Sequence, residues 1–184
     1  MVKHYPGTTI EVSELSHGCS RALFDGIFAT GGITLSQVCL MTGLEPYMVQ
    51  NWVKRGFLSS PKKRIYSRSQ FARVIIINML KESLQIEKIC SFIEIVGGVL
   101  EDDTDDLISD DELYHRYVDM LSDDSIDMRE PESVLLAAEK IAHGFRENSP
   151  GENKKLVRIL QVMFYAHFAS GLRASANEIL SSLQ

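Results

Sequence analysis

Residues 34–58 of this chain read TLSQVCLMTGLEPYMVQNWVKRGFL. Thr34 is a favourable N-cap for a first helix, and Gly43 supplies the positive φ that ends a helix in a tight turn. Pro46 suits the first turn of a second helix, which Gly56 then ends. Two short helices joined through a glycine turn are typical of a helix-turn-helix. The expected helices are Leu35 to Thr42 and Pro46 to about Arg55.

The second of these helices is amphipathic, and its two faces predict different roles. Its apolar side chains fall on the side that faces the first helix, where we expect Trp52 to be a core anchor. Gln and Asn side chains can pair with an adenine edge, and Lys reaches guanine or a phosphate. We therefore expect this helix to enter the major groove of DNA. The outward side chains are Tyr47, Gln50, Asn51 and Lys54.

The charge distribution favours the same interpretation. No Asp or Glu occurs between Glu45 and Glu82, although the chain has a net charge of −6. At the chain-wide frequency of acids, this stretch would hold about five of them. Exclusion of acids from one segment of an acidic protein indicates that the segment faces a polyanion. Its basic residues are Lys54, Arg55, Lys62, Lys63, Arg64, Arg68, Arg73 and Lys81.

The segment after the second helix predicts a short β-hairpin over Phe57 to Tyr66, with a basic tip. Basic side chains at such a tip grip the DNA backbone and supply affinity rather than sequence choice. Ser67 and Gln70 then form a capping box that opens a helix through about Leu80. Arg68, in the first turn of that helix, extends the basic track, whereas Arg73 and Lys81 are expected bystanders. The tip residues are Lys62, Lys63 and Arg64.

The rest of the chain predicts further helices, so we expect a mostly α fold with two parts. Residues 1–98 hold 11 basic and 7 acidic side chains, and residues 99–184 hold 8 and 18. We assign 1–98 to a winged helix-turn-helix head and 99–184 to an acidic α-helical module for dimerisation or an effector. The other expected helices lie in 8–29 (one or two), Ile86 to Val96, the segment around Leu113 to Leu121, Glu132 to Phe145 and Lys154 to Leu183.

Two features of the acidic half bear on function. The last helix has more apolar side chains than a single stripe needs, so it is central or packs against a partner, and we expect a homodimer through the C-terminal helices. Residues 101–132 carry fourteen acids against two bases. A calcium loop needs ligands in a register that Asp102 to Asp106 lacks. We take this run as a solvated loop, and Glu101 to Asp111 could also fold against the basic face and weaken non-specific DNA binding.

Several other classes of function are excluded or disfavoured. Three cysteines without CxxC spacing support neither a zinc site nor a disulfide framework. Five dispersed histidines suggest no metal site or catalytic triad, and no phosphate loop, GxSxG or HExxH motif occurs. We therefore predict no enzyme, no metal and no cofactor. The sequence has no apolar run long enough for a membrane span and no signal peptide, so we expect a cytoplasmic protein.

Leu35 through Ile89 resembles the winged-helix head of the MerR family of bacterial transcription regulators. The resemblance is carried by TLSQV at 34–38, Gly43-Leu44, WVKRGFL at 52–58 and RIYS at 64–67. The whole chain is similar to an uncharacterised bacterial family that joins such a head to an acidic helical tail. This chain departs from MerR proteins in Gln50, which stands where they have Arg, and in Gly97-Gly98, which interrupts their long coiled-coil helix.

The resemblance implies a transcriptional regulator whose partner is double-stranded DNA. The alternative is a helical interaction or scaffold protein that has the winged-helix shape but does not bind DNA. The sequence does not indicate the operator, activation or repression, or a small-molecule effector. The predicted DNA-binding residues are Thr34, Tyr47, Gln50, Asn51, Lys54, Lys62, Lys63, Arg64, Tyr66 and Arg68.

Overall fold

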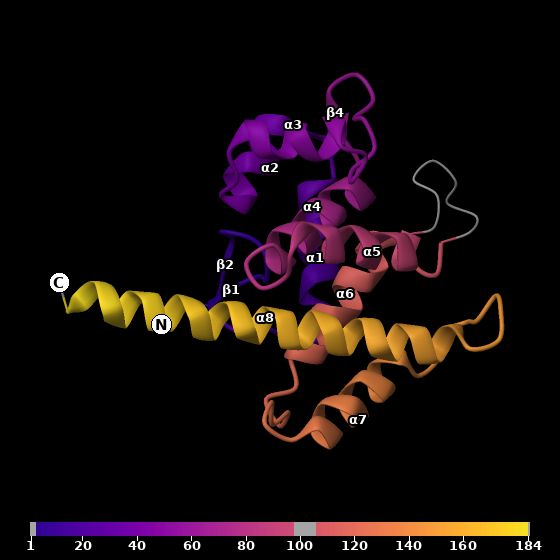
Figure 1. Ribbon diagram of the computed structural model, residues 1–184. Coiled ribbons are helices and arrows are strands. Elements are labelled where there is room, and N and C mark those ends of the chain that lie inside the picture. The colour runs from indigo at the N-terminus through magenta and orange to yellow at the C-terminus, as the bar shows by residue number, and fades with distance from the viewer. Residues whose placement is uncertain (1–2, 98–105, 184) are drawn as a thin grey trace.

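A computed structural model describes residues 3–97 and 106–183 (Figure 1). Within these ranges the chain is mostly α-helical, as expected, with eight helices and two small antiparallel two-stranded sheets. None of the described helices combines the length and apolar character that a bilayer crossing requires. The helices are α1 (Cys19–Ile27), α2 (Leu35–Thr42), α3 (Pro46–Lys54), α4 (Arg68–Leu80), α5 (Ile86–Gly97), α6 (Asp110–Leu121), α7 (Pro131–Ala142) and α8 (Glu152–Ser182).

The N-terminal segment holds one of the one or two helices expected within 8–29, together with strands that were not expected. The helix is α1, and β1 (Lys3–His4) pairs with β2 (Glu11–Val12). Gly7 between these strands has φ 72°, and a Cβ there would lie 2.5 Å from the carbonyl oxygen of Ile75. The first strands therefore turn tightly against α4, and this close approach is a tertiary contact that local sequence patterns do not report.

The α2–α3 pair follows the predicted boundaries. Thr34 and Gln37 form a capping box at the start of α2, and Gly43 adopts φ 68° between the helices. Asn78 of α4 donates through Nδ2 to the carbonyl oxygens of Gly7 (2.9 Å) and Thr42 (3.0 Å). This amide ties the end of α2 to the central helix, so the helix pair is fixed on the core.

The predicted hairpin over 57–66 is largely replaced by a different pairing. Its second strand, β4 (Ile65–Tyr66), pairs antiparallel with β3 (Ile33–Thr34), which precedes α2. Within the segment itself only Lys62 and Ile65 form an isolated bridge. Pro61 has no N–H to donate, so the arm before the turn is a poor strand, and Ile33 supplies the missing partner from a distant part of the sequence.

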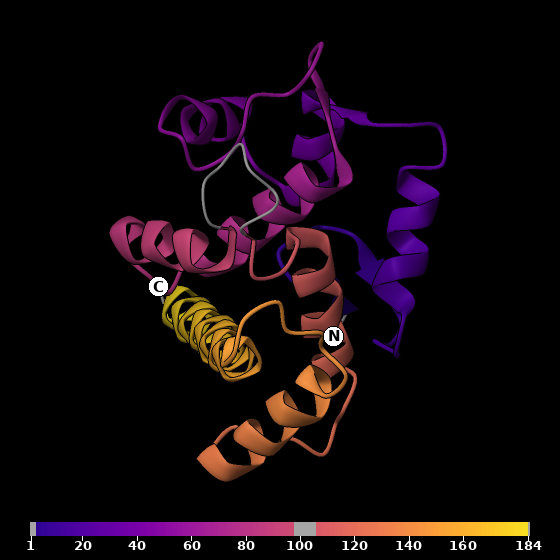
Figure 2. The same cartoon turned by 90° about the vertical axis from the view of Figure 1, so that its right-hand side faces the viewer.

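The core is centred on α4, whose residues 71–77 are all buried. It packs against both α6 and α8, and α7 closes the far side of α8 (Figure 2). Buried apolar residues from both sides of the expected 98/99 boundary belong to one cluster. The assignment of residues 1–98 and 99–184 to separate modules remains a prediction.

The last helix, α8, has two unlike halves. Its first half contributes Leu156, Leu160, Met163 and Phe164 to the core. Its residues 171–182 are all exposed, and this half projects beyond the body of the molecule toward the C-terminus (Figure 1). The first half of α8 therefore takes the central position that was one of the two expected alternatives, and the exposed second half is the part that could meet a partner.

Candidate nucleic-acid interface

The outer face of α3 is exposed and polar. Val49 and Trp52 are buried, with 0% and 5% of their surface accessible, while Tyr47 is 68% exposed. Gln50, Asn51 and Lys54 are also exposed. The amphipathic pattern thus gives the expected division between an inner and an outer face, and Trp52 is a core residue. We call Tyr47, Gln50, Asn51 and Lys54 the α3 face.

Next to α3 lies a tight turn formed by Lys62, Lys63, Arg64 and Ile65, which we call the basic turn. The N–H of Ile65 donates to the carbonyl oxygen of Lys62 at 2.9 Å, and Lys63 and Arg64 have φ of 52° and 66°. Two successive positive φ values define a type I′ turn, which favours Asn and Gly. Lys and Arg in these positions store backbone strain, and such strain is concentrated at functional sites.

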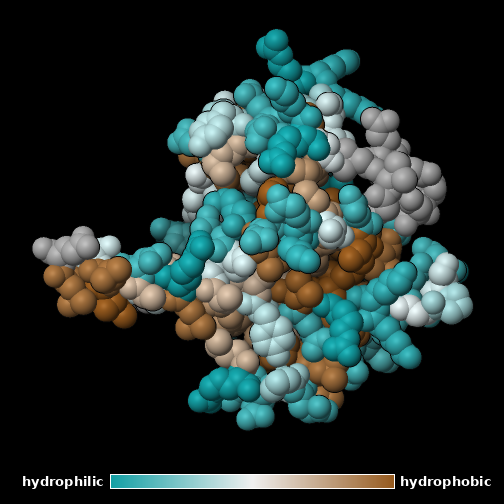
Figure 3. Space-filling view, viewed as in Figure 1, coloured by the Kyte–Doolittle hydropathy of each residue, from teal (hydrophilic) through white to brown (hydrophobic). Residues whose placement is uncertain are grey.

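The basic turn presents its charges to solvent. Lys62, Lys63 and Arg64 are exposed, and they enter no ion pair with the described residues of the chain. Both views place α3 and the turn at the same end of the molecule, away from α7 and α8 (Figures 1 and 2). Hydrophilic residues gather over this end in the space-filling view (Figure 3). The arrangement makes a polar and cationic surface.

Three of the predicted DNA-binding residues make structural contacts within the chain. The Thr34 side chain accepts from the N–H of Gln37 at 3.4 Å and caps α2. Tyr66 is 3% exposed, and burial raises the pKa of its hydroxyl. Arg68 donates to Asp25 at 2.7 Å and lies 3.5 Å from an oxygen of Asp111. These contacts engage the three side chains within the fold, and their part in DNA binding remains a prediction.

Other bases of the acid-free segment are also neutralised. Arg73 Nε donates to Asp110 Oδ2 at 2.7 Å with both side chains buried, and Lys81 pairs with Glu82. Burial raises the pKa of Asp110 to about 6, against the opposing effect of Arg73. Asp110 and Asp111 come from the acidic half, so part of it lies against these bases. The rest of the expected acidic contact, 101–105, lies outside the described residues.

One basic residue at this end was left out of the sequence-based site. Arg55, the C-cap of α3, is exposed, and its guanidinium lies 4.8 Å from the centre of the Phe57 ring. The sequence does contain a signal for this contact: Arg55 stands two positions before the aromatic Phe57, with the turn glycine Gly56 between them. The contact holds the Arg55 guanidinium over Phe57, so Arg55 adds an exposed cation at the C-terminal end of α3.

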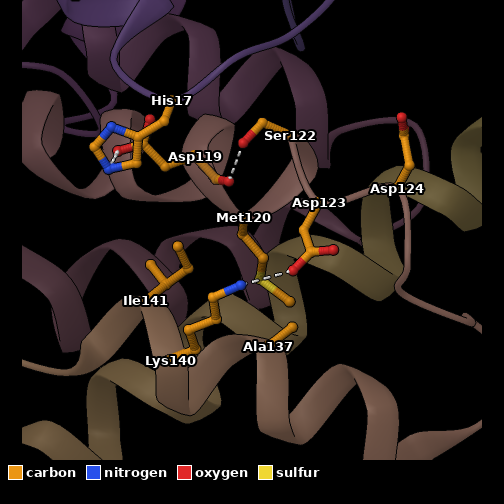
Figure 4. Close-up of a pocket in the computed structure, with 9 residues that line it drawn as sticks. All are labelled: His17, Asp119, Met120, Ser122, Asp123, Asp124, Ala137, Lys140 and Ile141. Carbon is orange, nitrogen blue, oxygen red and sulfur yellow. Dashed lines mark hydrogen bonds and ion pairs between the residues drawn. The ribbon is translucent and has the colours of Figure 1, made fainter.

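Apart from this surface, a hollow of about 340 Å³ is lined by His17, just before α1, and by residues of α6, of α7 and of the loop between them (Figure 4). Its Asp119 accepts from the Gly18 N–H at 2.8 Å and from Arg21 at 2.6 Å, and Lys140 pairs with Asp123 at 3.0 Å. These groups satisfy one another, so we interpret the hollow as a structural link between helices. In 3–97 and 106–183 no cluster of three His, Cys, Asp or Glu side chains could hold a metal ion.

These features define a mostly α-helical protein with a polar, cationic end built on a glycine-turned helix pair. Residues 34–117, from the cap of α2 into α6, match the model of a family described as "Domain of unknown function (DUF1836)". The chain is similar to the "Uncharacterized protein YkrK" of Bacillus subtilis (strain 168), with 24% identity over 162 residues that cover 82% of this chain and 70% of that protein. No solved structure matches. The predicted similarity to an uncharacterised family is confirmed, while likeness to MerR proteins is a proposal.

Proposed function

We propose that this protein is a DNA-binding transcriptional regulator that reads duplex DNA with a MerR-like winged helix-turn-helix. The observation that carries the proposal is the division of the bases in the acid-free segment. Arg68, Arg73 and Lys81 are neutralised by acids, whereas Lys54 and the basic turn lie exposed at one end of the molecule. A surface kept free of acids and of internal ion pairs is suited to phosphates.

In this proposal α3 enters the major groove. A helix of this size presents one short face to base edges, and the α3 face holds Gln50 and Asn51 next to Lys54. The two amides favour adenine and the ammonium favours guanine or phosphate. Tyr47, at the N-terminal end of the helix, is placed to contact the sugar-phosphate backbone.

The basic turn acts as the wing. Its three cations would neutralise phosphates beside the groove that holds α3, which contributes affinity without sequence information. The left-handed backbone at Lys63 and Arg64 supports this role, since uncharged Asn and Gly would satisfy the turn with less strain. Retention of strained cations at an exposed tip indicates that their charge is used.

The alternative function is a protein-interaction module with the same helix pair. One observation favours it: Leu40, in the last turn of α2, is 77% exposed. Apolar residues on a surface are common, so this single side chain weighs less than the group of cations. Both candidates use the α2–α3 end of the molecule, and salt dependence separates them.

The test is fluorescence anisotropy of the full chain with mixed-sequence duplex DNA over a series of salt concentrations. We expect binding that weakens steeply with salt, and Lys62→Ala/Lys63→Ala/Arg64→Ala should reduce the slope of log K against log salt by about 2.7. Lys154→Ala/Lys155→Ala/Arg158→Ala removes three exposed charges from α8 and should leave the slope unchanged. Absence of binding to any duplex at low salt would favour the interaction module.

A further inference from the structure

The exposed side of α8 carries a regular apolar stripe. Its members are separated alternately by three and four residues, which is the a/d repeat of a coiled-coil seam. Val162, Tyr165, Leu172, Ile179 and Leu183 are between 40% and 78% exposed, and Ala169 and Ala176 are exposed as well. We define the α8 stripe as Val162, Tyr165, Ala169, Leu172, Ala176, Ile179 and Leu183.

The stripe does not contribute to the core of its own chain. Core residues of α8 such as Leu160, Met163 and Phe164 lie on the opposite side of the helix, and the projecting half has no buried residue at all. In the space-filling view this half ends in a hydrophobic surface that stands clear of the body (Figure 3). An amphipathic helix that turns a heptad seam toward solvent lacks the second helix that such a seam requires.

We infer that the α8 stripe is the interface of a homodimer in which two copies of α8 pair antiparallel, centred near residue 174. The order of large and small residues along the α8 stripe indicates that the helix packed against it is a second, antiparallel copy of α8. Between residues 169 and 179 the a positions of the stripe are Ala169 and Ala176, and the d positions are Leu172 and Ile179. Parallel helices would pair Ala with Ala and leave two layers poorly filled, because a packs on a and d on d.

An antiparallel pair places a against d. In the register centred near 174, Leu172 of one copy meets Ala176 of the other, and Ala169 meets Ile179, so every inner layer joins a large side chain to a small one. The outer layers join Tyr165 to Leu183. The stripe is thus complementary to itself in one orientation, which is the requirement for a two-fold dimer.

The body of the molecule offers a seat for the end of the partner helix. A groove of about 630 Å³ lies beside Tyr165 and is lined by Leu84, Pro131 and Ala169 among others. In the antiparallel register the partner's C-terminal turn, with exposed Leu180 and Leu183, arrives at this groove. Charge does not oppose the approach of the partner helix. After Tyr165 the sequence has only two Asp, Glu, Lys or Arg residues, Arg173 and Glu178. Arg173 pairs with Glu82 of its own chain.

The oligomeric state of the full chain tests the interface without DNA, so its outcome is independent of the proposed function. Sedimentation velocity should give twice the chain mass of 20.7 kDa. Leu172→Asp/Ile179→Asp should weaken dimerisation about 100-fold or more. Ala174→Asp/Ser181→Asp, with the same added charge on the other side of the helix, should not. All four sites are exposed in one copy, so circular dichroism should be unchanged. A monomeric wild type, or a dimer insensitive to the stripe charges, would overturn the inference.

Disulfide mapping tests the orientation. Chains carrying Leu172→Cys and, separately, Ala176→Cys are mixed and oxidised mildly, and the cross-linked peptides are identified by mass. The antiparallel register predicts disulfides between the two different variants. Disulfides that join each variant mainly to itself would show a parallel pair and overturn the proposed register.

Discussion

Arg73 on α4 donates from Nε to Asp110 on α6 at 2.7 Å, and both side chains are buried. The pair joins the acid-free segment to the acidic half of the chain. A Cβ at Gly97 would lie 2.4 Å from the Arg73 guanidinium, so the end of α5 also fits around this contact. Arg73 is therefore a structural residue, in agreement with its expected place as a bystander among the bases of the acid-free segment.

Removal of the carboxylate should destabilise the fold. Asp110→Ala leaves a buried, unpaired guanidinium, and we expect a loss of about 3–5 kcal/mol in the free energy of unfolding. Urea denaturation followed by circular dichroism measures it. Asp111→Ala is the matched control, because Asp111 is partly exposed and its contact with Arg68 at 3.5 Å is long. A loss of more than about 1 kcal/mol in the control would argue against this assignment.

Substitutions that relieve the backbone strain of the basic turn should raise the stability of the fold and lower its affinity for DNA. Lys63→Asn/Arg64→Gly fits the two left-handed positions, so the free energy of unfolding should rise by about 1–2 kcal/mol. Affinity for duplex DNA should fall, since two cations are lost. Lys62→Asn removes a charge from a residue that is not among the positive-φ positions and should give no such gain. Equal stability changes in the two variants would contradict the strain at the tip.

Gly43 is the position at which the α2–α3 turn depends on glycine. Gly43→Ala places a Cβ at φ 68° and 3.0 Å from the Thr9 side chain, so we expect a loss of about 1–2 kcal/mol. Gly26→Ala, inside α1 with no heavy atom near its Cβ, should be neutral or stabilise by up to about 1 kcal/mol. Thermal unfolding of the two variants compares them, and a harmless Gly43→Ala would mean that the turn tolerates a side chain.

The buried His115 and the half-buried His167 should make the fold sensitive to mild acid. Burial lowers the pKa of both His115 and His167 below the ordinary value of 6.5. Each therefore contributes stability above pH 6.5 that is lost as the pH falls through that value toward the folded-state pKa, because the unfolded chain binds the proton first. Asp110 acts in the opposite direction, since its pKa is raised to about 6.

His167→Gln isolates one of these contributions. The slope of unfolding free energy against pH between 7.5 and 5.5 should become shallower by at most about 1.4 kcal/mol per pH unit, the limit for one proton. His143→Gln, at an exposed position, is the matched control for removal of an imidazole. An unchanged slope in His167→Gln would show that His167 is protonated alike in both states. The 2.7 Å hydrogen bond between His167 Nδ1 and the Tyr117 hydroxyl would then have no effect on the protonation of His167.

Local structure was predictable where neighbouring residues decide it. The boundaries of α2 and α4 agree with their capping residues, Thr34 and Ser67, since each cap bonds within its own first turn. The hairpin and the N-terminal strand pair were less predictable. β4 pairs with Ile33, and Gly7 packs against Ile75, and no local pattern reports such distant partners.

By itself the sequence determined the helices, the glycine turn and the amphipathic α3, because these depend on residues a few positions apart. Only the tertiary structure decided which cations of the acid-free segment remain free. Arg68 meets Asp25 across 43 positions and Arg73 meets Asp110 across 37, so their charges are used inside the fold. The tertiary structure also decided which side of α8 faces solvent, because burial against α4, α6 and α7 occupies the opposite side and leaves the stripe exposed.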